Sequence, residues 1–183
     1  MGEAVTAPTE RTHAAKMMMV VLALGAGFAL VPRAVRGCEA GHDESAADFT
    51  ADVIANKEIA GGDKLTLSAL RGKPVVLDFW ATWCGPCQMT APIVNSVSQR
   101  YRDKGLVVIG VNVDDDTFPV ERFVRKKNLT FPIVWDDGKA ISRDYGASTL
   151  PTLVVVSKEG KIVAVRHGVT SESDLDALVK RVL

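Results

Sequence analysis

Cysteine is scarce in this chain of 183 residues, which has only Cys38, Cys84 and Cys87. A small scaffold held together by several disulfides is therefore excluded. The chain also lacks an excess of charge, because 22 Lys and Arg residues balance 22 Asp and Glu residues. No electrostatic attraction to nucleic acid is expected from this balance. Internal repeats and low-complexity tracts are missing too, so the length fits one ordinary domain and a leader.

The leader is predicted over residues 1–37, where residues 17–31 form an apolar run without a charged side chain. This run is short for a transmembrane helix and long for the apolar part of a secretory signal. It has no amphipathic stripe, which disfavours a buried helix of a soluble domain. Three alternatives remain open: an uncleaved signal anchor, a cleaved signal peptide and a lipoprotein signal.

The lipoprotein alternative depends on Cys38. Val35 and Gly37 before this cysteine resemble a lipobox, in which Cys38 would carry the lipid. Arg33 and Arg36 depart from that pattern, since a lipobox normally follows its apolar run directly. The small, polar residues of 38–48 then predict a flexible linker to the domain.

The remaining residues, 49–183, alternate between patterns typical of strands and of helices. Strands are predicted at 64–67, 75–80, 106–113, 131–135, 153–156 and 161–166, and helices at 84–102, 120–127, 140–145 and 171–183. The last two strands form a hairpin, and Ser171 caps the final helix with Asp174 at its third position. This order predicts an α/β fold, with a mixed central sheet flanked by helices.

The helix predicted at 84–102 has apolar residues at four-residue steps, which predict one buried face. These residues are Met89, Ile93, Val97 and Tyr101. Pro92 lies inside the helix and is expected to kink it.

Cys84 and Cys87 have the spacing C-x-x-C, and they follow the apolar strand 75–80 and open the next helix. The N-terminus of a helix favours an anion, so the pKa of the Cys84 thiol is expected to fall toward ~7. The Cys84 thiolate would attack a partner disulfide, and Cys87 would resolve the mixed disulfide. Gly85 would let a substrate backbone approach, and Pro86 suits the first helical turn.

Zinc binding, a structural disulfide and inert core cysteines are the alternatives for this pair. Zinc needs at least three protein ligands, whereas no second C-x-x-C is present and His13, His42 and His167 are distant in sequence. A disulfide that closes so short a loop stabilises little. A redox dithiol without metal or cofactor is therefore expected.

Asp78 interrupts the apolar strand 75–80, where an ionised carboxylate is costly to bury. Burial would raise its pKa, which makes Asp78 a candidate proton acceptor for Cys87. The alternative is a structural ion pair with a lysine such as Lys57.

The segment DFWATWCGPC, residues 78–87, resembles the active site of the thioredoxin superfamily, including Trp80 and Trp83. The loop Leu150-Pro151-Thr152 resembles the family's loop with a cis-proline that faces the dithiol. The resemblance implies a thioredoxin fold in which Pro151 is cis and the backbone of Leu150 pairs with the substrate. It also places Trp83, Gly85 and Pro86 in the substrate-binding surface.

About one extra βα unit lies between residues 118 and 140. Together with segments 65–77, 105–116 and 129–138, it resembles the TlpA/ResA-like branch of the superfamily. The branch implies an extracytoplasmic, membrane-anchored protein, periplasmic in a Gram-negative cell, held by an N-terminal anchor or lipid. Asp78 departs from the Asn of many branch members. Thr152 replaces an acidic residue that is frequent in the branch's cytochrome c maturation proteins.

The leading functional prediction is a reductase of disulfides in exported proteins, recharged by a membrane electron donor. Three alternatives are a cytochrome c maturation thioredoxin, a peroxiredoxin-like peroxidase and a non-catalytic binding module. Thr82-Trp83-Cys84 does not match the context of a peroxidatic cysteine. Cys84 and Cys87 are both present, which disfavours a binding module that does not catalyse disulfide exchange.

Overall fold

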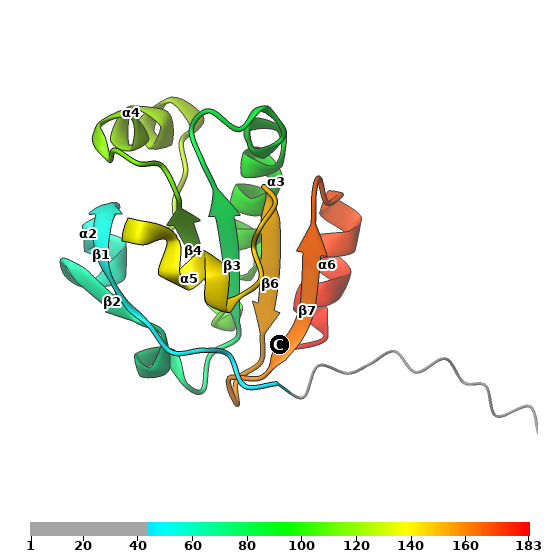
Figure 1. Ribbon diagram of the computed structural model, residues 1–183. Coiled ribbons are helices and arrows are strands. Elements are labelled where there is room, and N and C mark those ends of the chain that lie inside the picture. Colours follow the sequence, from blue (N-terminus) through cyan, green and yellow to red (C-terminus); the bar gives the residue numbers. More distant parts are fainter. Residues whose placement is uncertain (1–43) are drawn as a thin grey trace, which may run out of the picture. The chain divides into compact units, whose positions relative to one another are not determined.

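A mixed sheet of seven strands forms the centre of the molecule (Figure 1). The structure is a computed structural model and describes residues 44–183, so the predicted leader and Cys38 lie outside the described residues. The strands are β1 (Thr50–Ala55), β2 (Lys64–Thr66), β3 (Val75–Trp80), β4 (Val107–Asn112), β5 (Ile133–Trp135), β6 (Thr152–Val156) and β7 (Ile162–His167). Their order is β2-β1-β5-β4-β3-β6-β7. Strands β3, β4 and β5 are parallel, and all other neighbours are antiparallel, which confirms the predicted mixed sheet.

Helices cover both faces of this sheet. In Figure 1, α5 (Ala140–Asp144) lies in front of the sheet, and α3 (Gly85–Tyr101) and α6 (Glu172–Lys180) lie behind it. Helix α4 (Phe118–Lys127) packs into the same apolar cluster as α3 and α6. The short elements are α2 (Lys57–Ala60) and the 3₁₀ turns η2 (Leu67–Leu70), η3 (Arg102–Lys104) and η4 (Asp137–Lys139). Among the described residues, none of the helices is long and apolar enough to cross a membrane.

Strand β3 is buried along its whole length, as its apolar sequence predicts. Successive side chains of a strand point to opposite faces of the sheet. Leu77 and Phe79 belong to the cluster on the α5 face, and Val76 and Trp80 belong to the cluster on the α3 face. Asp78 therefore projects toward the α3 face, where both cysteines of the C-x-x-C pair also lie.

The extra unit predicted near residues 118–140 consists of α4 followed by β5. Strand β5 lies between β4 and β1 and continues the parallel part of the sheet. Helix α4 buries Phe123, whose ring lies 4.8 Å from that of Trp80. The insertion thus packs directly against the end of β3 that leads to the C-x-x-C pair.

The buried face of α3 differs from the prediction. Met89 is 62 % exposed, whereas Val97 and Tyr101 are buried. An α-helix has 3.6 residues per turn, so a series with four-residue steps rotates steadily around the helix axis. The face that packs on the sheet therefore includes Thr90, Ala91 and Val94 in place of Met89.

Residues 44–48 belong to the segment that composition predicts to be a flexible linker, yet they contact the domain. Ser45 pairs with Lys161 in an antiparallel bridge, and the Ala46 N–H donates to the Gly160 carbonyl at 2.9 Å. The Tyr145 hydroxyl donates to the Ala47 carbonyl at 2.6 Å. Ordered contacts therefore begin before residue 49.

Candidate active site

The C-x-x-C pair lies at the N-terminus of α3, where the sequence predicts it. Cys84 is the N-cap residue, and its Sγ accepts a hydrogen bond from the Cys87 N–H at 3.1 Å. The two cysteines form a disulfide and are 5 % and 2 % exposed. An N–H donor and a helix N-terminus both stabilise an anion on sulfur, and both favour Cys84 as the thiolate of the reduced pair.

Asp78 is buried on the same face of the sheet as this pair. Its Oδ1 has no hydrogen-bond partner among the described residues, and burial raises the pKa of its carboxyl to about 7. The alternative of an ion pair with Lys57 is wrong, because Lys57 pairs with Asp63 at 2.7 Å on the surface. Asp78 is thus a buried carboxyl whose pKa lies far above that of a solvent-exposed aspartate.

The peptide bond between Leu150 and Pro151 is cis, as the resemblance implies. Thr152 follows it at the start of β6 and pairs with Phe79 in β3, so this loop and the C-x-x-C loop lie at the same end of the sheet. The Thr152 hydroxyl donates to the Thr149 carbonyl at 2.7 Å, and the Gly168 N–H donates to the Pro151 carbonyl at 2.7 Å. These bonds hold the loop on the ends of β6 and β7.

A cavity of about 560 Å³ is lined by Trp83, the residue that precedes Cys84. Trp83 and Leu150, two predicted substrate-binding residues, both line it, together with Val113 and Ala147. Trp83 is 69 % exposed, which is unusual for so large an apolar side chain. At Gly85, an added Cβ would meet no atom within 4 Å, so the surface next to Cys84 is open.

The comparisons with known proteins agree with this geometry. Residues 43–179 match the Redoxin family. The chain belongs to the Redoxin family. The thiol-disulfide oxidoreductase ResA of Bacillus thuringiensis is 36% identical over 121 residues, which cover 66% of this chain and 70% of the relative.

Solved structures place this Redoxin-family chain among thioredoxin-like folds. One is a Chlorobium tepidum protein assigned as thiol:disulfide interchange protein DsbE, with a TM-score of 0.70 and 28% identity over 77% of this chain and 96% of that one. Another is a secreted Mycobacterium tuberculosis disulfide oxidoreductase, with a TM-score of 0.63 and 26% identity over 73% and 95%. The predicted family, fold and enzyme class, a thiol–disulfide oxidoreductase, are confirmed.

Asp114 is a residue of this Redoxin-family site to which sequence reasoning assigned no role. It follows β4, is 4 % exposed, and its Oδ2 accepts hydrogen bonds from the Thr82 N–H and from Asn112 Nδ2, both at 2.9 Å. Thr82 stands two residues before Cys84. In the sequence, Asp114 is visible only as the first of three consecutive aspartates, 114–116. Such a run is typical of a solvent-exposed turn and does not indicate a buried carboxylate.

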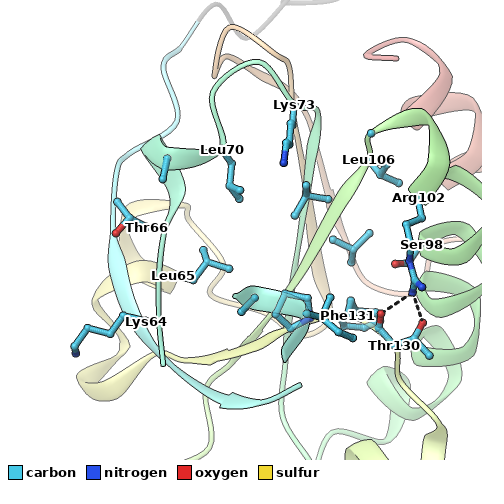
Figure 2. A pocket seen from close by; sticks show the side chains of 17 residues that line it. Lys64, Leu65, Thr66, Leu70, Lys73, Ser98, Arg102, Leu106, Thr130 and Phe131 are labelled. Carbon is cyan, nitrogen blue, oxygen red and sulfur yellow. Dashed lines mark hydrogen bonds between the residues drawn. The ribbon is translucent and has the colours of Figure 1, made fainter. Parts of the chain in front are cut away.

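A second cavity, of about 410 Å³, lies at the other end of the sheet (Figure 2). Val107 and Val108, at the start of β4, contribute to its wall, whereas the C-x-x-C pair follows the end of β3. Arg102 donates from Nη2 to the Thr130 carbonyl at 2.9 Å on one side, and the Lys73 side chain points in from the rim (Figure 2). Its lining contains no Cys, His, Asp or Glu, and both cysteines of residues 44–183 lie at the opposite end of the sheet.

Proposed function

We propose that this chain reduces disulfides of exported proteins through Cys84 and Cys87, outside the cytoplasm and attached to the membrane. The observation that carries the proposal is the position of Cys84 at the N-cap of α3, with the Cys87 N–H directed at its sulfur. This geometry favours a thiolate at Cys84 in the reduced protein.

The first step is an attack of the Cys84 thiolate on a substrate disulfide. One sulfur–sulfur bond of the substrate breaks, a bond forms between Cys84 and a substrate sulfur, and the other substrate sulfur leaves as a thiolate. The open surface at Gly85 leaves room for the substrate backbone to reach the sulfur.

The second step needs a thiolate at Cys87, which is buried in the same cluster as Cys84. Asp78 accepts the proton of the Cys87 thiol, because its raised pKa, about 7, suits proton transfer near neutral pH. Cys87 then attacks Cys84 Sγ, closes the Cys84–Cys87 disulfide and releases the second substrate sulfur. The substrate gains two electrons, and the enzyme is oxidised.

The substrate docks against Trp83 and the cis-proline loop. Trp83, next to Cys84 in sequence, and Leu150, next to Pro151, line one cavity whose wall is mostly apolar. In this proposal, the backbone of Leu150 pairs with an extended segment of the substrate, and Gly85, Pro86 and Pro151 belong to the surface that receives it.

The apolar run at 17–31 supports location outside the cytoplasm, as does the likeness to a secreted Mycobacterium tuberculosis oxidoreductase. A membrane donor of electrons then returns the disulfide to the dithiol. Mass spectrometry of the protein from membranes distinguishes an intact N-terminus, a lipid on Cys38 and a cleaved signal. Recovery from the cytoplasmic fraction alone contradicts this part of the proposal.

The exchange chemistry predicts that a Cys87→Ser variant accumulates mixed disulfides on Cys84, because the resolving thiol is missing. Trapped partners are identified on non-reducing gels by mass spectrometry, and insulin reduction measures turnover. Cys84→Ser is expected to lose both trapping and turnover, whereas Cys38→Ser is the matched control that keeps both. Full insulin reduction by Cys84→Ser would show that the nucleophile is assigned wrongly.

The direction of electron flow is tested by the reduction potential of the pair, measured by equilibration with glutathione. A reducing protein of this type is expected near about −270 mV, the potential of thioredoxin. A potential above about −150 mV would identify an oxidant instead.

A further inference from the structure

Asp114 is a buried carboxylate that accepts a hydrogen bond from the backbone N–H of Thr82, two residues before Cys84. Its neighbour in sequence, Asp115, has a side chain that is 90% exposed and pairs with Lys139 at 2.9 Å. Asp114 is only 4 % exposed, and no Lys or Arg among the described residues pairs with it. Burial of a carboxylate without a cation is costly, and neutral N–H donors compensate for it here.

Two donors converge on the same carboxylate oxygen. The Thr82 N–H and Asn112 Nδ2 both donate to Asp114 Oδ2 at 2.9 Å. Asn112 is fully buried, and its own Oδ1 accepts the Asp114 N–H at 3.2 Å. The pair Asn112–Asp114 is therefore a closed and rigid unit at the end of β4.

This unit holds the short loop that joins β3 to α3. Thr82 is tied to Asp114, and the Cys84 N–H donates to the Ala81 carbonyl at 3.2 Å. The loop is therefore bonded to Asp114, which lies two residues after the end of β4, and it has one bond of its own, from Cys84 to Ala81. Its geometry sets where the Cys84 sulfur lies relative to the Cys87 N–H.

The same unit also contacts the inserted segment and the element that leads to the cis-proline. Trp135 Nε1 donates to the Asp114 carbonyl at 2.9 Å, and the Asp136 N–H donates to the Asn112 carbonyl at 2.9 Å. The Asp136 carboxylate then accepts the N–H of Ile141 at 2.9 Å, at the start of α5. Helix α5 precedes the cis-proline loop in sequence, so one buried unit is joined both to the dithiol loop and to the segment that leads to the docking loop.

We propose that Asp114 is a positioning residue for the dithiol, whose carboxylate holds the loop from Thr82 to Cys84 in the geometry that exchange requires. The proposal rests on the proposed exchange reaction at Cys84. Without the bond to Thr82, the loop relaxes, the Cys84 sulfur moves away from the Cys87 N–H, and the thiolate loses part of its stabilisation.

The test compares Asp114→Asn with Asp114→Ala. Both variants remove the negative charge, but Asn keeps an oxygen that can accept from Thr82 and Asn112, and Ala does not. A difference between the two variants therefore reports the hydrogen bonds. Asp115→Ala is the matched control, because it removes an exposed carboxylate one residue away.

Two quantities are measured on folded, reduced full-length protein. The apparent pKa of Cys84 comes from the pH dependence of its alkylation by iodoacetamide, and kcat/KM comes from insulin reduction. Asp114→Ala is expected to have a Cys84 pKa about half a unit or more above that of Asp114→Asn. Its kcat/KM is expected to be about tenfold lower than that of Asp114→Asn. Asp115→Ala is expected to match the wild type.

Coincidence of the Ala and Asn variants in both measurements would overturn the proposal. So would a loss of stability in Asp114→Ala, measured by urea unfolding, without any change in the Cys84 pKa. The alkylation measurement needs no substrate. If the wild-type protein reduces no disulfide, the proposed function fails while the pKa comparison still tests the role of Asp114.

Discussion

At the scale of single residues, the burial of Asp78 has two consequences. It lowers the stability of the folded protein when the carboxyl is ionised, and it raises the pKa of that carboxyl. Asp78 lies in the middle of a fully buried strand, and its Oδ1 has no partner among the described residues. Replacement by an apolar residue of similar size would remove the cost of ionising a buried carboxyl. The same cost raises the pKa of Asp78 to about 7, which is the value that a proton acceptor needs at neutral pH.

An Asp78→Asn substitution is expected to stabilise the oxidised protein above pH 7. The unfolded chain releases the Asp78 proton near pH 3.8, whereas the folded protein keeps it until about pH 7. Ionisation therefore favours unfolding as the pH rises through this window, and the cost above pH 7 is about 4 kcal/mol at about 1.4 kcal/mol per pKa unit. The amide side chain of the variant does not ionise, so the variant lacks this loss.

Urea unfolding of the oxidised wild type and variant between about pH 3.5 and about pH 8.5 checks this prediction, because this range includes the pKa of Asp78 in both the unfolded and the folded protein. The relevant quantity is the difference between the two proteins. Other carboxyls, such as Asp176, whose pKa is lowered by its hydrogen bond to Lys180, change stability in the opposite direction in both proteins. Parallel curves for the two proteins would show that Asp78 does not titrate in this window.

The residues of the site differed in how well the sequence predicts them. Cys84, Cys87 and Asp78 are close in sequence, and a carboxylate inside an apolar strand is visible without a structure. Asp114 is brought to Thr82 only by the pairing of β3 with β4, and its sequence context is that of an acidic turn. Local patterns thus identify the candidate reactive groups, whereas the bond from Thr82 to Asp114 depends on contacts across the sheet.

At the scale of elements, the core strands and both edge strands, β2 and β7, were predicted, whereas β1, which lies between β2 and β5, was not. Strands β3 and β4 are buried along almost their whole length and are mostly apolar, because both faces of the sheet are covered there. Strand β1 alternates between exposed and buried residues, contains Asp52 and was not predicted. It is held by pairing with β2 and β5, and the pairing with β5 is distant in sequence.

Helix α6 begins at a cap that the sequence predicts. The Ser171 hydroxyl accepts the Asp174 N–H at 3.2 Å, which satisfies one of the free N–H groups of the first turn. Ser171→Ala is expected to lower the free energy of unfolding by about 1 kcal/mol.

Urea unfolding at neutral pH measures the effect of the cap, and Ser148→Ala is the control, because Ser148 is exposed and lies outside the helices. Equal stability of the two variants would mean that the cap contributes nothing. Insulin reduction should stay unchanged in Ser171→Ala, since α6 lies behind the sheet and carries none of the proposed catalytic groups (Figure 1).

At the scale of the whole molecule, residues 44–48, which precede β1, contact the domain at three separate places. Residues 44–48 contribute the bridge to Lys161, the bond from Tyr145 to Ala47 and a bond from the Ser68 N–H to the Asp48 carboxylate at 2.8 Å. These contacts reach the residue before β7, the residue after α5, and η2. The packed domain therefore starts before the predicted start at residue 49, because small residues such as Ala46 fit closely against a hairpin, which composition does not reveal.

A fragment of residues 49–183 is therefore expected to be less stable than a fragment of residues 44–183. The loss of several hydrogen bonds, including the partner of the largely buried Tyr145 hydroxyl, predicts a difference of about 2–4 kcal/mol. Thermal unfolding of both fragments in the oxidised state measures it. Equal midpoints would mean that residues 44–48 lie against the domain without stabilising it.

The exposed indole of Trp83 makes the intrinsic tryptophan fluorescence of this protein sensitive to changes near Cys84. Trp83 is 69 % exposed beside the Cys84–Cys87 disulfide, whereas Trp80 is 3 % exposed within the core. A disulfide quenches the emission of an adjacent indole, and contact with a partner removes water from it. If the substrate docks at Trp83 as proposed, the emission of Trp83 changes with both the oxidation state of the pair and the arrival of a substrate, against a background from Trp80 and Trp135.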